Sequence, residues 1–133
     1  MLVHAIGNFA LYFSIAVVAL MLFKVIYAAI TPHDEWQLIK QEENTAAAIA
    51  FGGAILGFSI ALAGAISNSV DLIDFLIWGA IALLAQLVAF ALVRFIFMPK
   101  IVARIQNNEI SAAIVLLAVS VSVGLLNAAS LSY

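Results

Sequence analysis

The sequence contains no cysteine, and only 9% of its 133 residues are charged. Without cysteine, disulfide bonds and thiol chemistry are excluded. In an ordinary soluble domain about a quarter of the residues are charged, so this chain lacks the polar surface that contact with water requires. Basic residues are also few, five Lys and Arg against seven Asp and Glu, and the resulting net charge of −2 argues against nucleic acid as a partner.

Apolar residues, in contrast, make up 67% of the chain, and the mean hydropathy is +1.24. Four uncharged stretches can each supply the roughly 20 apolar residues that cross a hydrocarbon layer about 30 Å thick. None shows the alternating polarity of a barrel strand, so we expect helices. The sequence predicts an all-α, integral membrane four-helix bundle, a single transmembrane domain over residues 1–133, with spans at about 5–30, 45–68, 73–97 and 110–131.

The charges indicate how the spans are oriented. Short loops that carry Lys and Arg stay in the cytoplasm. The five cations all flank or occupy the first and third loops: Lys24, Lys40, Arg94, Lys100 and Arg104. Because no cation precedes Lys24, we expect the first stretch to be a retained span and not a cleaved signal peptide. Both termini are therefore expected in the periplasm or outside the cell.

The two halves of the chain resemble each other. Residues 44–49 (NTAAAI) align with residues 109–114 (EISAAI), and each stretch follows a loop that contains a proline, Pro32 or Pro99. Each half holds two spans, so equivalent helices point the same way. The pattern predicts two parallel two-helix repeats, residues 1–70 and 71–133, related by an axis along the membrane normal.

Both cytoplasmic loops are predicted to contain a short helix at the membrane interface. In the first loop Thr31 is a candidate N-cap and Pro32 a candidate first helical residue. In the third loop the basic residues Lys100 and Arg104 lie four positions apart on one helix face. The alternative is that both loops are ordinary linkers with positive-inside charges. Candidate contacts with anionic lipid or a cytosolic partner are Trp36, Lys40, Lys100 and Arg104.

Small residues recur on one face of the second and fourth spans. Such faces let two helices approach closely, and packing then drives their association. We expect these two spans to form the centre, with the bulky Phe, Leu and Ile residues of the first and third spans facing lipid. The spacing leaves open whether the partner helix belongs to the same chain or to a homo-oligomer. The candidate packing residues are Gly53, Gly57, Ala61, Gly64, Ala65 and Gly124.

Gln86 is the most informative single residue, because it lies near the middle of the third span among leucine and valine. An amide in lipid needs hydrogen-bond partners, and these usually lie across a helix contact. One hypothesis is that the polar residues of the spans make interhelical bonds and that the arginine anchors the interface; the other is that they line a polar path. These residues are Gln86, Arg94, Asn68, Ser120 and Asn127.

Enzymatic chemistry is not expected. His4 and His33 are predicted on opposite sides of the membrane, so they cannot share a metal ion within one chain. The predicted spans contain no central carboxylate for a proton relay, and the chain shows no phosphate-binding loop and no serine with an available base. The sequence therefore predicts no catalytic residue, no cofactor and no metal site.

The combination of motifs resembles the YjfL-like small inner-membrane proteins of bacteria, a family with a domain of unknown function. The matching stretches are TPHDEWQLIK at 31–40, NTAA at 44–47, AFGG at 50–53, LGF at 56–58, WG at 78–79, QL at 86–87, Phe90, Arg94, Pro99 and GLLNAA at 124–129. Two positions depart from the family pattern. Ile60–Leu62 lack a proline that often interrupts the second span, so a kink is less expected there, and Ser130 replaces a frequent cysteine.

The resemblance implies a multi-spanning inner-membrane protein with a duplicated two-helix unit and no established activity. Members are often encoded beside membrane-remodelling proteins of the phage-shock type and peptide-ligase-like enzymes, which suggests envelope maintenance. Two functions follow as hypotheses. The first is a non-enzymatic, homo-oligomeric scaffold or partner subunit in envelope maintenance or stress. The alternative is a small oligomeric channel or transporter with a polar path through Gln86, Ser120 and Asn127.

Overall fold

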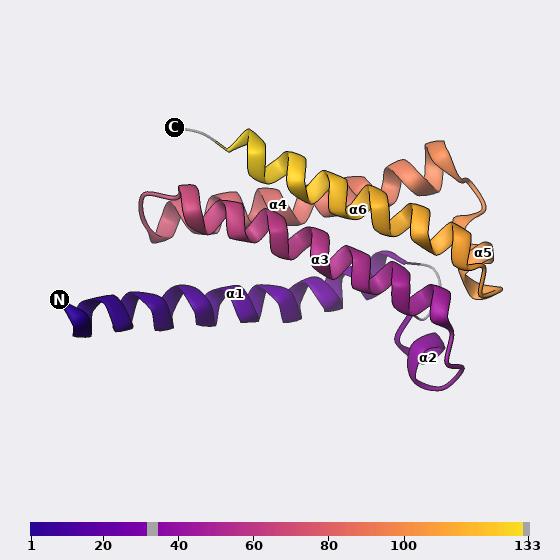
Figure 1. Cartoon of the computed structure of the whole chain (residues 1–133), viewed down its shortest axis with the longest axis horizontal. Coiled ribbons are helices and arrows are strands. Elements are labelled where there is room, and N and C mark those ends of the chain that lie inside the picture. Colours follow the sequence, from indigo (N-terminus) through magenta and orange to yellow (C-terminus); the bar gives the residue numbers. More distant parts are fainter. Residues whose placement is uncertain (32–34, 132–133) are drawn as a thin grey trace.

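The computed structural model describes residues 1–31 and 35–131, without the side chains of Glu35 and Trp36, and this part of the chain is entirely helical apart from short turns. Four long helices are apolar enough to cross a membrane, each with a mean hydropathy above 2 in its most apolar window. They are α1 (Leu2–Ile30), α3 (Thr45–Asn68), α4 (Leu72–Leu92, continued by the π-helix η1, Val93–Phe97) and α6 (Ile110–Ser130). Two short helices, α2 (Glu35–Lys40) and α5 (Ile101–Gln106), lie in the connections (Figure 1).

The turns explain where the long helices begin and end. Asp71 is the N-cap of α4, and its carboxylate accepts a hydrogen bond of 2.8 Å from the backbone N–H of Asp74. The carboxylate of Asp74 in turn accepts from the N–H of Val70 at 3.0 Å. Both acids therefore serve the helix start, where otherwise unpaired N–H groups and the helix dipole favour negative charge.

The centre of the bundle is the pair α3 and α6, which run in the same direction and make the most extensive helix contact, with α4 packed against both (Figure 1). Small residues dominate this centre, and Ala46, Ala50, Ala61 and Ala65 of α3 have no exposed surface. Because a small side chain leaves little bulk between two backbones, the α3 and α6 axes can come close together.

The prediction that the bulky Phe, Leu and Ile residues of the first and third spans face lipid is wrong at three positions. Phe23 of α1 and Phe75 and Phe90 of α4 are at most 4% exposed, and Tyr27 of α1 is also buried. The ring of Phe23 stacks on that of Phe58 with centroids 4.7 Å apart. Large rings fill the space that the small residues of α3 leave open on the side facing α1 and α4.

Helix α1 lies at the edge of the bundle. Residues 1–11 are all exposed, and α1 meets the other helices from Tyr12 onward (Figure 1). Its contacts there are aromatic: Tyr12 with Phe75 at 5.3 Å and Tyr27 with Phe90 at 5.7 Å between ring centroids. An apolar cavity of about 290 Å³ between α1 and the α3–α4 pair shows how loosely this helix packs.

The loop helices differ in detail from the prediction. Thr31, the expected N-cap of the first loop helix, closes α1: its hydroxyl donates to the carbonyl of Tyr27 at 2.9 Å. Pro32 and His33 lie outside the described residues, and α2 begins at Glu35. In α5, Ile101 and Ile105 are fully buried against the bundle, so these apolar residues contact protein and not headgroups.

Candidate functional site

Close glycine contacts join α3 to α6. A methyl group at Gly53 would lie 2.6 Å from the Cα of Leu117, and one at Gly64 would lie 2.6 Å from the Cβ of Ala128. Between them, a methyl group at Gly57 would collide with the carbonyl oxygen of Ser120, and one at Gly124 with the carbonyl oxygen of Gly57. No β-carbon fits at these positions without displacement of a neighbour. The small-residue faces are therefore occupied within one chain.

Gln86 of α4 completes this contact. Its side chain is 2% exposed, and its Nε2 donates to the backbone carbonyl of Ser120 at 3.2 Å. Its Oε1 has no hydrogen-bond partner in the described part of the chain and lies 2.8 Å from the position of a β-carbon on Gly57. The oxygen thus faces the Cα hydrogen of Gly57, a weak contact that recurs between closely packed helices. We call Gln86, Gly57, Ser120 and Gly124 the three-helix junction.

The other polar residues of the spans are not brought into this junction. The side chain of Asn68 donates to the carbonyl of Gly64 in its own helix at 2.8 Å, and the hydroxyl of Ser59 donates to Ile55 at 2.8 Å. Asn127 is two turns beyond Ser120 along α6, and its Nδ2 is buried without a hydrogen-bond partner among the described residues. No hydrogen bond in the described chain links Asn127 to Gln86, so the structure draws no continuous polar path through this single copy.

A second polar cluster joins the two loops at the end where α3 and α6 begin. Asn44, the buried N-cap of α3, accepts from the N–H of Ala47 at 2.8 Å and donates to the carbonyl of Ile105 at 2.9 Å. Asn108 accepts from the N–H of Ala46 at 2.9 Å. We call Asn44 and Asn108 the asparagine clasp. The sequence patterns place Asn44 in the repeat and in the family motif and predict no cap there, although an asparagine directly before an apolar helix is a signal for a cap.

The backbone in front of α3 and α6 has the same unusual conformation. Glu43 has a φ of 51° and Asn108 a φ of 60°, both in the left-handed region. Each immediately precedes the N-cap of a long helix, Asn44 for α3 and Glu109 for α6. Asparagine tolerates this conformation better than most residues, whereas for glutamate it is uncommon.

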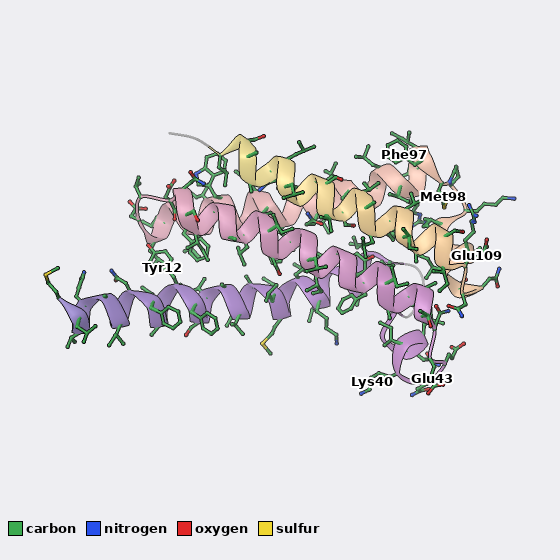
Figure 2. The ribbon with its side chains drawn as sticks, in the orientation of Figure 1. Tyr12, Lys40, Glu43, Phe97, Met98 and Glu109 are labelled. Carbon is green, nitrogen blue, oxygen red and sulfur yellow. The ribbon has the colours of Figure 1, made fainter. Side chains whose placement is uncertain are left out.

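The cationic residues lie at the same end of the bundle as the clasp. Arg104 donates to Glu109 at 3.2 Å across the α5–α6 turn, and both side chains are more than a third exposed. Arg94 is on η1, with its guanidinium carbon 5.3 Å from the centroid of the Phe95 ring. Lys40 and Lys100 are exposed, and the side chain of Trp36 is outside the described set. Figure 2 shows Lys40 and Glu43 beside α2, on the opposite edge from Phe97 and Met98.

Ligand chemistry is limited at both sites. Among the described residues, no three His, Asp or Glu side chains come together to hold a metal ion. The three-helix junction offers one amide, one serine and two glycines in a contact that is already filled. Its arrangement can hold three helices together at one level of the membrane, and the clasp can fix where two of them begin.

Comparison with known proteins decides the family. Residues 1–131 match the Domain of Unknown Function DUF350. The chain belongs to this family. The DUF350 chain is 42% identical over 125 residues to the UPF0719 inner membrane protein YjfL of Escherichia coli (strain K12), covering 94% of the chain and 93% of that protein. It is 29% identical over 123 residues to the UPF0719 transmembrane protein YshE of Bacillus subtilis (strain 168), covering 92% and 91%. No solved structure matches.

These relatives confirm the predicted resemblance to YjfL-like proteins. Together with the four apolar helices, they support a multi-pass location in the inner membrane for this DUF350 protein. The name of neither relative states an enzymatic activity.

Proposed function

We propose that this DUF350 protein is a non-enzymatic inner-membrane scaffold or partner subunit that acts in envelope maintenance or stress. The observation that carries the proposal is the three-helix junction. Gln86, the amide within the apolar helix α4, is 2% exposed and bonded to a backbone carbonyl. Intramembrane polar groups in transport proteins face a cavity or a pathway, whereas this one makes a helix contact.

The scaffold is built, in this proposal, from two parallel repeats with both termini in the periplasm. Two findings support the repeat. Gly53 packs on Leu117 and Gly64 on Ala128, pairs with the same separation along the chain, and a left-handed residue precedes the N-cap of both α3 and α6. The orientation rests on the positive-inside rule, because all five Lys and Arg residues lie near one end of the helices.

The homo-oligomer that we propose for the scaffold uses other surfaces than the glycine faces. Gly53, Gly57 and Gly124 are occupied by contacts within one chain. The outer surface of α1 is the apolar surface that we propose for this contact, since residues 1–11 are all exposed. The short helices α2 and α5, at the end of the bundle that holds the asparagine clasp, then remain accessible to a cytosolic partner.

A channel or transporter is the second candidate, and one observation favours it. Gln86 Oε1 and Asn127 Nδ2 are buried without hydrogen-bond partners in the described chain. A buried polar atom left unpaired is costly, and an ordered water is one common remedy. Ordered water at both atoms would form part of a water-filled pathway along α6.

One experiment separates the two functions. The full-length protein is reconstituted in liposomes, its subunit number is counted by stepwise photobleaching, and fluxes of ions and small solutes are measured for wild type and Gln86→Leu. We expect more than one copy per particle and no protein-dependent flux from either form. A flux in wild type that Gln86→Leu alters would establish the channel and reject the scaffold. Single copies throughout would reject the homo-oligomeric scaffold.

A further inference from the structure

The segment that follows α4 has an unusual conformation and an unusual surface. Val93–Phe97 form a π-helix, in which the N–H of Met98 donates to the carbonyl of Val93 at 2.8 Å. Val93 is fully buried, whereas the next apolar residues, Phe95, Ile96 and Phe97, are 70%, 65% and 60% exposed. Short π-helical turns are rare and are frequent at functional sites. Here the turn anchors one residue in the bundle and presents three apolar side chains to the bilayer.

Arg94 lies within this apolar segment, where its charge must either be paired or reach the membrane interface. Three exposed apolar residues follow it before the turn, so the guanidinium is near lipid tails as well as headgroups. An arginine at such a level is stabilised by a charged partner or by reaching the interface. Residues 75–108 contain no Asp or Glu, and no carboxylate contacts Arg94 in the described part of the chain. Its recorded partner is the neighbouring Phe95 ring.

Lys100 is the second cation without a carboxylate partner in the described chain. It is exposed and is the N-cap residue of α5. The two residues Ile101 and Ile105 have no exposed surface, so α5 is held against the bundle and the position of Lys100 relative to η1 is restricted. Arg104 differs, because its charge is compensated by Glu109 at 3.2 Å.

The first loop provides a contrast at the same end of the bundle. It carries Lys40 together with the exposed acids Glu42 and Glu43, and Lys40 makes interactions of its own. Figure 2 places Lys40 and Glu43 on the edge opposite Phe97. Arg94 and Lys100, neither of which has a carboxylate partner among the described residues, thus both belong to η1 and the start of α5, next to exposed apolar side chains.

We propose that Arg94 and Lys100 bind the phosphate group of an anionic phospholipid whose acyl chains lie along Phe95, Ile96 and Phe97. The guanidinium offers paired N–H donors that match phosphate oxygens, and the ammonium adds a second positive charge. The three apolar residues supply the surface for the tails. This inference concerns a lipid site and holds whether the protein is a scaffold or a channel.

The test measures lipid retention by the purified full-length protein. Native mass spectrometry follows binding of phosphatidylglycerol and phosphatidylethanolamine with identical acyl chains to wild type, Arg94→Gln, Lys100→Gln and Lys40→Gln. Wild type should prefer phosphatidylglycerol. Arg94→Gln and Lys100→Gln should each weaken that binding about fivefold, the factor that corresponds to about 1 kcal/mol per basic residue at an anionic surface. Lys40→Gln removes the same charge at the opposite edge and should change little.

Additional arms make every result decisive. Circular dichroism checks folding of each variant, and Lys100→Gln carries the test if Arg94→Gln does not fold. A large excess of inorganic phosphate should leave phosphatidylglycerol bound; full displacement would assign the site to a soluble anion. No preference for phosphatidylglycerol, or an equal loss in Lys40→Gln, would overturn the proposal. So would a Lys100→Gln variant that changes the oligomer mass while lipid retention is unaltered, since the cations would then contact a second copy.

Discussion

Replacing Gly57 with alanine tests whether α3 and α6 are held together by backbone contact. The added methyl group would meet the carbonyl oxygen of Ser120 and would lie 2.8 Å from Gln86 Oε1. The first neighbour is backbone and cannot rotate away, so α6 must shift. Overpacking of this kind typically costs about 1–3 kcal/mol. The expected result is a loss of stability in that range, although alanine is the better helix former.

Gly52→Ala is the matched control, because it makes the same chemical change one residue earlier on the same helix. A methyl group at Gly52 meets no atom within 4 Å. The control should leave stability unchanged or raise it by up to about 1 kcal/mol through helix propensity alone. Reversible unfolding of the full-length protein by SDS in mixed micelles, followed by circular dichroism, measures both variants. If Gly57→Ala and Gly52→Ala unfold at the same SDS fraction, the close contact does not exist and the three-helix junction is wrong.

Three further predictions address other parts of the molecule. Asn44→Ala should lower stability by about 1–2 kcal/mol, since it removes the cap of α3 and the bond to the carbonyl of Ile105 in α5; an unchanged SDS midpoint would contradict the clasp. Arg104→Gln should cost less than about 1 kcal/mol in the same assay, because its ion pair with Glu109 is more than a third exposed, and a larger loss would show a role beyond this pair. Because the chain has no cysteine, the single-cysteine variants Ser69→Cys and Asn107→Cys can each report topology. In intact cells a membrane-impermeant maleimide should label only Ser69→Cys, whereas labelling of Asn107→Cys alone would show the opposite orientation.

The spans were predictable because a membrane helix is defined by length and by the absence of charge. The expected boundaries at residues 45, 68, 97 and 110 coincide with the ends of α3, η1 and α6, and charged or capping residues lie close to each. The four spans together with the family resemblance were therefore accessible from the residues alone.

The packing around α1 was not predictable for a physical reason. Lipid tails and protein interiors are about equally apolar, so hydropathy does not distinguish a lipid-facing phenylalanine from a buried one. Phe23 and Phe75 have no more than 1% of their surface exposed, yet Phe9 and Phe13, in the same kind of sequence, are 66% and 57% exposed. Only the arrangement of the helices separates them.

The hydrogen-bond partners of the polar side chains also could not be predicted from the sequence. Gln86 was singled out as an amide in an apolar span, but it bonds to a backbone carbonyl, which every residue possesses. Asn108 completes α3 from the other half of the chain, and its effect depends on which loops meet. A pattern can identify a residue that needs a partner without identifying the partner.

The asparagine clasp has a consequence for biogenesis. The chain emerges from the ribosome N-terminus first, so α1 and α3 leave the ribosome before Asn108 does. Until then the N–H of Ala46 lacks its partner, and Asn44 cannot reach the carbonyl of Ile105. The first hairpin can therefore insert but cannot complete its own helix start. The start of α3 is therefore completed only when the second half of the chain has formed. Formation of the turn before α6 and packing of α6 are then the last steps in the assembly of the bundle.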